Sequence, residues 1–125
     1  MDRMEKGLTF ESTDVVRFEN VAKTIGSGDL EVFATPAMAA LMENAAMNAV
    51  ARELPEGTTT VGALLRISHS RPSGLGEKVT AVATLKEVDG RKLTFTVVAH
   101  DSKGVIGEGE HIRYVVNKER FLSKL

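Results

Sequence analysis

Residues 35–54 read TPAMAALMENAAMNAVAREL and carry the longest helical signal in the chain. Thr35 is a residue type that favours the N-cap position, and Pro36 suits the first helical position because its missing N–H would be unpaired there in any case. Alanine, methionine and leucine, which are strong helix formers, fill most of the remainder. Pro55 and Gly57 then stop the helix. The segment therefore predicts one long helix over residues 35–54.

After this helix, apolar and polar residues alternate with a period of two, as they do in strands that bury one face. Residues 60–70, 78–85 and 93–99 each predict such a strand, and residues 105–116 predict a last long one. The expected inward rows are Val61, Ala63, Leu65, Ile67 and His69; then Val79, Ala81, Ala83 and Leu85; then Leu93, Phe95, Val97 and Ala99.

Turn signals connect these strands in a simple order. Asp89-Gly90 favours a hairpin, and residues 101–104 form a second turn. We also predict a strand near residues 8–16 and a short terminal helix capped by Asn117. This order predicts a single α+β domain over residues 1–125, with one helix packed on one antiparallel sheet. One helix covers one face of such a sheet and leaves its edges free, so we expect a homodimer or a larger oligomer.

Composition excludes several classes of site. The chain has no cysteine, which rules out disulfides, thiolate nucleophiles and cysteine-ligated metals, and its histidine spacing gives a metal site little support. Acidic and basic residues are mixed, with a net charge of −1, and only one tyrosine and no tryptophan are present, so we expect no nucleic-acid partner. No apolar run could span a bilayer and no signal peptide is evident, so we expect no membrane partner and a cytoplasmic location.

Glu43 is the first candidate for chemistry. At 100° per residue it lies beside Ala39, Ala46 and Val50, on the flank of the apolar side of the helix. A carboxylate in apolar surroundings costs several kcal/mol unless it is paired or protonated. Glu43 therefore either has a partner or a catalytic task, or it lies at the edge of the apolar arc and reaches water.

His69 and Thr35 are two further candidates. His69 lies at the end of an inward row, where it acts either as a hydrogen-bonded core residue or as an acid and base near neutral pH. Thr35 needs no role beyond capping, although a helix N-terminus also offers free N–H groups that can hold an oxyanion. Since Thr35 and Glu43 are roughly 12 Å apart along the helix axis, a site that uses both is either elongated or shared between subunits.

The remaining histidines give weaker signals. His100 is expected in a solvated turn, and His111 faces the same way as Arg113. No Gly-x-Ser-x-Gly elbow is present, which excludes an α/β-hydrolase.

Several short segments together resemble the fluoroacetyl-CoA thioesterase-like group of the hotdog superfamily, from about Leu30 to the C-terminus. Their order and spacing carry the resemblance, above all a threonine, a glutamate eight residues later and a histidine on a strand. The segments are Val32-Phe33-Ala34-Thr35, Leu41-Met42-Glu43, Val61-Gly62, Ile67-Ser68-His69-Ser70, Ala99-His100-Asp101, Gly109-Glu110-His111-Ile112-Arg113 and Glu119-Arg120-Phe121-Leu122.

The resemblance implies a hotdog fold, in which a curved antiparallel sheet wraps a long central helix, with active sites at a dimer interface. It implies hydrolysis of a short-chain acyl-CoA thioester without a cofactor. Thr35, Glu43 and His69 match the catalytic set. Gly62 and Arg113 match substrate-binding positions.

Two details of the substrate follow from the same resemblance. The halogen-selective member has phenylalanines where this chain has Gly26 and Asp29, so we expect a commoner acyl group. Arg71, Lys78 and Arg120 are candidates for binding the CoA phosphates.

Other functions stay open at this point. A plain structural or interaction domain would leave Glu43 and His69 on apolar flanks without an explanation, and two further functions involve acyl thioesters. One is a non-catalytic module that binds acyl-CoA or an acyl carrier protein. The other is a hotdog hydratase or dehydratase, although the Asp and His motif usual for that chemistry is absent.

Overall fold

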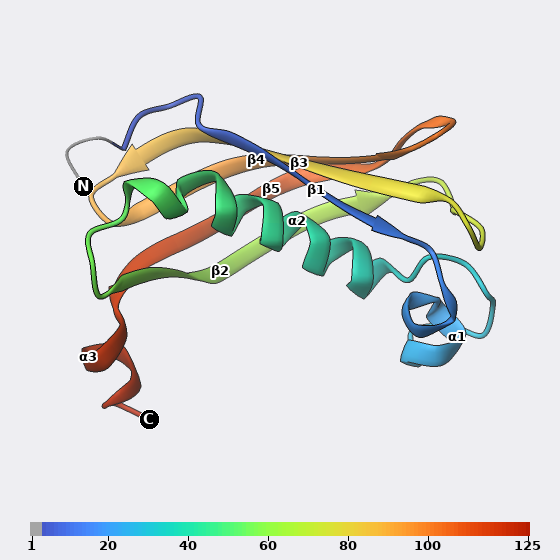
Figure 1. Cartoon of the computed structure of the whole chain (residues 1–125), viewed down its shortest axis with the longest axis horizontal. Coiled ribbons are helices and arrows are strands. Elements are labelled where there is room, and N and C mark those ends of the chain that lie inside the picture. The colour runs from blue at the N-terminus through green and yellow to red at the C-terminus, as the bar shows by residue number, and fades with distance from the viewer. Residues whose placement is uncertain (1–3) are drawn as a thin grey trace.

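The computed structural model describes residues 4–125 and shows one long helix lying against a curved antiparallel sheet (Figure 1). Residues 1–3, which begin the segment predicted to lack a signal peptide, lie outside the described range. The strands are β1 (Thr9–Val15), β2 (Thr58–His69), β3 (Lys78–Asp89), β4 (Lys92–Asp101) and β5 (Gly104–Asn117). The helices are α1 (Ala22–Ile25), α2 (Thr35–Val50) and α3 (Lys118–Leu122), with 3-10 turns at Phe18–Asn20 and Ala51–Glu53.

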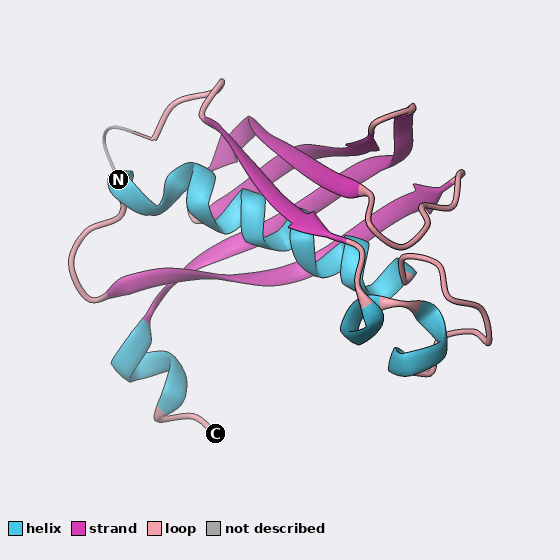
Figure 2. Cartoon of the chain, turned by 45° about the vertical axis from the view of Figure 1, so that its right-hand side comes forward, coloured by secondary structure: helices cyan, strands magenta, loops and turns pink. Residues whose placement is uncertain are grey.

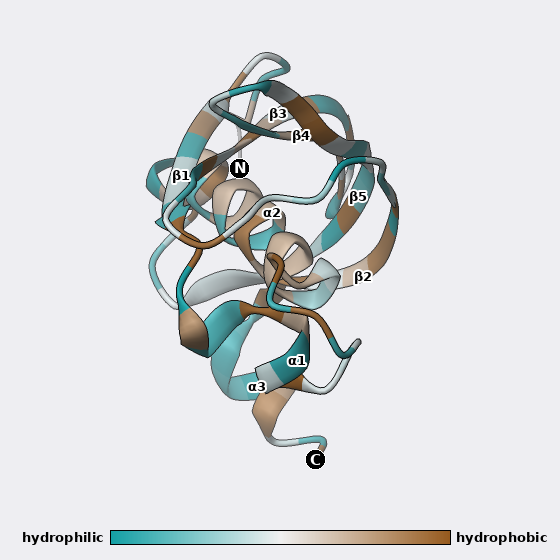
Figure 3. Cartoon of the chain, turned by 90° about the vertical axis from the view of Figure 1, so that its right-hand side faces the viewer, coloured by the Kyte–Doolittle hydropathy of each residue, from teal (hydrophilic) through white to brown (hydrophobic). Residues whose placement is uncertain are grey.

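The sheet has the strand order β1-β3-β4-β5-β2, and all of its pairs are antiparallel. β1 and β2 are therefore its two edges. Seen end-on, the sheet curves around α2, and the helix lies in the concave side (Figure 3). This arrangement confirms the predicted α+β class.

The core lies between α2 and the concave face of the sheet. The inward rows predicted for β3 and β4 are all fully or almost fully buried, and they pack with Met38, Met42, Ala45, Ala46 and Val50 of the helix. The predicted terminal helix is also present, and the side chain of Asn117 accepts a hydrogen bond from the backbone N–H of Arg120 at 2.9 Å.

The capping role predicted for Thr35 is wrong. Ala34 is the N-cap residue of α2 and makes no side-chain capping bond, whereas Thr35 is the first helical residue. Its hydroxyl therefore does not serve the N-terminus of the helix and is used elsewhere, as described below. The helix also ends earlier than predicted, at Val50, and its last predicted turn is the 3-10 turn Ala51–Glu53.

The predicted inward row of β2 is wrong in its first half. The pairing of β2 with β5 slips between Gly62 and Leu64, where Ala63 forms a bulge. Because an extra residue reverses the alternation of faces, Thr60 and Gly62 point inward together with Leu65, Ile67 and His69. Val61 and Ala63 therefore belong to the other face, and Ala63 is exposed.

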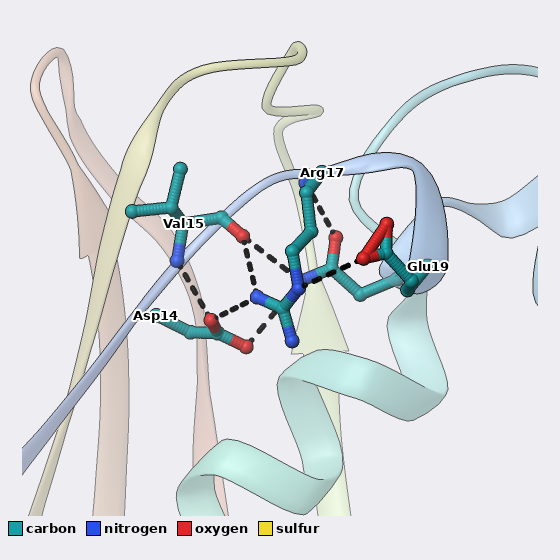
Figure 4. Close-up of polar contacts among 5 residues, drawn as sticks. Asp14, Val15, Arg17 and Glu19 are labelled. Atoms are coloured by element: carbon teal, nitrogen blue, oxygen red, sulfur yellow. Dashed lines mark hydrogen bonds and ion pairs between the residues drawn. The ribbon is translucent and has the colours of Figure 1, made fainter.

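A polar network fixes the turn between β1 and the segment that leads into α2. Asp14 accepts hydrogen bonds from the guanidinium of Arg17 and from the backbone N–H of Val15, and Arg17 also lies 3.6 Å from Glu19 (Figure 4). In Figure 2 this turn lies beside the N-terminal end of α2. The network holds the chain where it returns toward the start of that helix.

No helix among residues 4–125 combines the length and the apolar composition needed to cross a membrane.

Candidate functional site

Thr35 and His69 meet at one end of the molecule. Oγ1 of Thr35, on the first turn of α2, lies 2.7 Å from Nδ1 of His69, the last residue of β2. Nε2 of His69 is buried and has no hydrogen-bond partner among residues 4–125. Burial lowers the pKa of His69, and a backbone contact with Arg71 opposes this effect. A neutral imidazole bonded to a hydroxyl is the arrangement that general base chemistry requires.

A cavity of about 240 Å³ opens beside this pair. The N-terminal turn of α2 and the segment after β2 form much of its wall. Its lining residues are Ala22, Ser27, Val32, Phe33, Thr35, His69, Ser70, Arg71 and Pro72.

A buried carboxylate supports this wall. Asp101 accepts hydrogen bonds from Ser73 at 2.7 Å and from Arg71 at 3.3 Å, and it is paired with the guanidinium of Arg71. The pKa of Asp101 is lowered: burial alone would raise it, but the bonds from Ser73 and Lys103 and the charge of Arg71 outweigh burial. Asp101 therefore stays ionised and holds the loop in place.

Glu43 lies further along α2, in a second cluster of functional residues. Because Gly62 has no side chain, it leaves a small open space in this cluster. A methyl group added at Gly62 would lie 3.3 Å from Cε1 of His111, and 3.5 Å from both Nη1 of Arg113 and Oε2 of Glu43. Glu43 is half-buried, and it makes no hydrogen bond or ion pair within 4 Å to another residue of the described chain. The carboxylate is thus close to two basic side chains and remains available to a ligand.

Arg113 is held in place by buried partners. Its Nε and Nη2 donate to the hydroxyl and the carbonyl of Thr60, at 2.8 and 2.9 Å. Its Nη1 lies 3.2 Å from Nε2 of His111. Burial lowers the pKa of Arg113 and the charge of Glu43 opposes this, so the carboxylate helps to keep the guanidinium charged.

His111 is a fully buried residue that carried only a weak signal in the sequence. Because Nη1 of Arg113 can only donate, Nε2 of His111 accepts, and Nδ1 donates to the carbonyl of Leu64 at 2.8 Å. Burial is the largest cause that lowers the pKa of His111. His111 is therefore a neutral residue with both ring nitrogens occupied, which orients Arg113.

The structure brings the predicted residues together in two groups. Thr35 contacts His69, and Glu43 lies near Gly62 and Arg113. Within one chain these groups stay apart, because Thr35 and Glu43 are roughly 12 Å apart along the helix axis. Among residues 4–125, no three His, Asp or Glu side chains are grouped as a metal site requires.

Comparisons with known proteins place these features among thioesterases. Residues 16–119 match the model of the FlK family, described as fluoroacetyl-CoA-specific thioesterase. The fluoroacetyl-CoA thioesterase of Streptantibioticus cattleyicolor is 40% identical over 95 residues, which are 76% of this chain and 68% of that protein.

Solved structures give the same result. A phenylalanine-to-alanine variant of FlK in complex with fluoroacetate and CoA superimposes with a TM-score of 0.88 and 34% identity, covering 94% of this chain and 99% of the other. A hot-dog-like protein from Thermanaerovibrio acidaminovorans superimposes with a TM-score of 0.88 and 25% identity, covering 97% and 90%. These similarities confirm the expected hotdog fold.

Proposed function

Because the chain belongs to the fluoroacetyl-CoA-specific thioesterase family and is an acyl-CoA thioesterase, we propose that it hydrolyses small acyl-CoA thioesters at sites shared between two subunits. Family membership favours hydrolysis over the alternatives of a binding module and a hydratase. The observation that carries the proposal is the separation, within one chain, of the Thr35–His69 pair from the group around Glu43.

The edge strand β2 offers a way to join the two groups. It is 12 residues long, and one of its sides has no partner strand among residues 4–125. Antiparallel pairing of two β2 strands about their middle would place the His69 end of one beside the Thr58–Gly62 part of the other. The two inward rows would then lie on the same face, so that Thr35 and His69 of one subunit approach Glu43, Gly62 and Arg113 of the partner.

In such a site, each side chain has a role that follows from its surroundings. The thioester carbonyl lies near the first turn of α2, whose N–H groups stabilise the developing oxyanion. His69, neutral near pH 7, takes a proton from the attacking hydroxyl, which belongs either to Thr35 or to a water held there. The carbon–sulfur bond then breaks, and the thiolate of CoA accepts the proton from His69.

Glu43 and Arg113 complete the reaction on the other side of the substrate. If Thr35 is the nucleophile, the carboxylate of Glu43 accepts a proton from the water that attacks the acyl-threonine, and this proton returns to Oγ1 of Thr35 as the free acid leaves. If water attacks the thioester directly, Glu43 orients that water. Arg113, fixed by Thr60 and His111, lies beside the open position at Gly62 and contacts the acyl group.

Subunit mixing tests this arrangement directly. Glu43→Ala and His69→Ala variants are each expected to hydrolyse acetyl-CoA very slowly. When the two are co-expressed, a mixed dimer with shared sites contains one site with both changes and one with neither. With random association, about a quarter of the wild-type activity then returns, because half of the dimers are mixed and each has one intact site.

The same experiment includes its own control. In each shared site, Thr35 and His69 come from the same subunit. A mixed dimer of His69→Ala and Thr35→Ala therefore has one site without His69 and one site without the Thr35 hydroxyl, so no activity returns. If Glu43→Ala and His69→Ala also give no recovery although mixed dimers form, the sites lie within single subunits and the proposal is wrong.

A further inference from the structure

A second cavity lies at the opposite end of the sheet from Thr35 and His69. It has a volume of about 570 Å³ and is lined by residues from the start of β2, the end of β5 and the β3–β4 hairpin. Figure 1 shows that these three parts lie at the same end of the sheet. Pro55, Val88 and Val115 give it an apolar part. Arg91 and Arg120 also line it.

The charge around this cavity is one-sided. A smaller adjoining cavity of about 80 Å³ is lined by the same two arginines and by Lys124. Among residues 4–125, no aspartate or glutamate lines either cavity. Within residues 4–125, Arg91, Arg120 and Lys124 form no ion pair within 4 Å. Acidic residues outnumber basic ones in the whole chain, 17 to 16, so two unpaired arginines shared by these adjoining cavities, with Lys124 beside them, are a local excess of positive charge that favours a polyanion.

We propose that this cavity binds the phosphorylated adenosine end of CoA, an inference that rests on the proposed function. The apolar part of the cavity accommodates the flat adenine ring, and the guanidinium groups of Arg91 and Arg120 bind the phosphates in the forked geometry that suits them. Lys124 adds a point charge at the rim. Arg71 and Lys78, the other basic residues considered for the phosphates, are not part of this cavity.

The distance to the reacting end of the substrate fits the pantetheine arm. Thr58, which lines the cavity, and Gly62, which leaves the open position beside Glu43, are four positions apart on β2. Val115 lines the cavity two positions after Arg113 on β5, and both are buried. The pantetheine arm is about twelve bonds long, which is the number of backbone bonds in about four residues. An extended arm therefore spans about 13 Å, as an extended backbone of that length does. A thioester beside Gly62 therefore places the phosphates near the start of β2, at the end of the sheet where Arg91 and Arg120 line the cavity.

Direct binding of adenosine 3′,5′-bisphosphate, measured by calorimetry, tests the inference without any catalysis. Arg91→Ala and Arg120→Ala are each expected to weaken binding about 10-fold, and the double variant more, because each removes a charged hydrogen-bond donor. Higher salt should weaken binding to the wild type more than to the double variant. Lys103→Ala is the matched control, since it removes an exposed cation in the turn at the far end of the sheet and should bind like the wild type.

Kinetics with two substrates complete the test. For acetyl-CoA, the double variant is expected to raise KM at least 10-fold with kcat nearly unchanged. For acetyl-pantetheine, which lacks the nucleotide, its KM should equal that of the wild type. Equal effects on both substrates, or loss of bisphosphate binding in Arg71→Ala and not in the double variant, would overturn the inference. Failure of subunit mixing to restore activity would contradict the proposed function but leave these binding results unchanged, so the two failures are distinguishable.

Discussion

Oγ1 of Thr35 lies 2.7 Å from Nδ1 of His69, a contact between residues 34 positions apart that joins the start of α2 to the end of β2. It explains why Thr35 does not cap its own helix, since its hydroxyl is turned toward the imidazole. The pair lines the first cavity, so the hydroxyl is bonded to an imidazole and also faces open space.

Replacing Thr35 separates the role of its hydroxyl from that of its shape. Thr35→Val keeps the branched side chain and removes the hydroxyl, and we expect kcat for acetyl-CoA to fall about 100-fold or more. Thr35→Ser keeps the hydroxyl and should retain activity within about 10-fold. Rapid-mixing measurements of CoA release decide the chemistry, because a burst of one CoA per site indicates an acyl-threonine. Wild-type activity in Thr35→Val would contradict any role for the hydroxyl.

The pH dependence of kcat/KM follows from the environment of His69. Burial disfavours the charged imidazole and lowers its pKa below the ordinary value of 6.5. As a base, His69 must be neutral, so kcat/KM should rise with pH, reach half its maximum below pH 6.5 and be constant near pH 7. A profile with its midpoint above pH 7 would contradict this assignment. Replacing the exposed His100 by Ala should leave the profile unchanged.

His111 is expected to affect the free energy of unfolding. His111→Ala leaves the carbonyl of Leu64 and Nη1 of Arg113 without their partner and opens a cavity, so we expect a loss of about 2–4 kcal/mol in urea unfolding. His100→Ala, at an exposed position of β4, should cost less than about 0.5 kcal/mol. Similar losses in the two variants would show that the buried contacts contribute little.

His111 also predicts how stability depends on pH. Its pKa is lowered in the folded protein, chiefly by burial, while in the unfolded chain it returns to about 6.5. Below pH 6.5 the unfolded state therefore binds more protons than the folded state, and the free energy of unfolding falls as the pH decreases. His69 contributes in the same direction. The slope between pH 7 and pH 5 should be smaller in a His111→Gln variant, and an unchanged slope would exclude His111 as its source.

Two glycines give a matched pair of substitutions. In Gly62→Ala the new methyl lies 3.3–3.5 Å from His111, Arg113 and Glu43, so it fits with small shifts but fills the open position beside the carboxylate. We expect kcat/KM to fall about 10- to 100-fold while unfolding in urea changes by less than about 1 kcal/mol. In Gly107→Ala the methyl would lie 2.5 Å from the backbone oxygen of Ser68, so the main loss should be stability. The reverse pattern, with Gly62→Ala unstable and active, would contradict a substrate position there.

The sequence predicted the fold well because local patterns carried it. Period-two rows placed the buried faces of β3 and β4, and strong helix formers between Thr35 and Pro55 placed α2. The resemblance supplied the hotdog arrangement, which the comparisons with solved structures support.

The incorrect predictions concern residues whose contacts lie far apart in the sequence, where local sequence patterns carry no information. The bulge at Ala63 depends on how β2 pairs with β5, and it moves Gly62 to the inner face. Thr35 is a favoured capping residue, but a partner 34 positions away takes its hydroxyl. His111 gave only a weak signal, because its burial and its two hydrogen bonds depend on neighbours from another strand. Glu43 was identifiable because a carboxylate on the flank of an apolar helix face is itself unusual.

The walls of the first cavity predict which acyl groups the enzyme accepts. Its volume of about 240 Å³ suits a short acyl chain, and among residues 4–125 Phe33 is the one phenylalanine, tyrosine or tryptophan that lines it. Neither of the two loop positions at which the resemblance places phenylalanines carries an aromatic side chain: Gly26 has a φ of 89°, where side chains are strained, and Asp29 is exposed. Without further aromatic contacts to distinguish fluorine from hydrogen, kcat/KM for fluoroacetyl-CoA and acetyl-CoA should agree within about 10-fold, as expected for so small a difference in an apolar pocket.

Competition between paired substrates, with mass spectrometry of the released acids, measures this ratio directly. Propionyl-CoA should be hydrolysed at a similar rate, and a long-chain acyl-CoA much more slowly, because the cavity is too small for it. A preference for fluoroacetyl-CoA above about 1,000-fold would contradict the prediction, since only specific contacts to fluorine could supply so large a difference. Asp29→Phe then serves as the informative variant: an aromatic ring added at this loop should change the ratio between the two substrates, whereas Asp29→Asn should not.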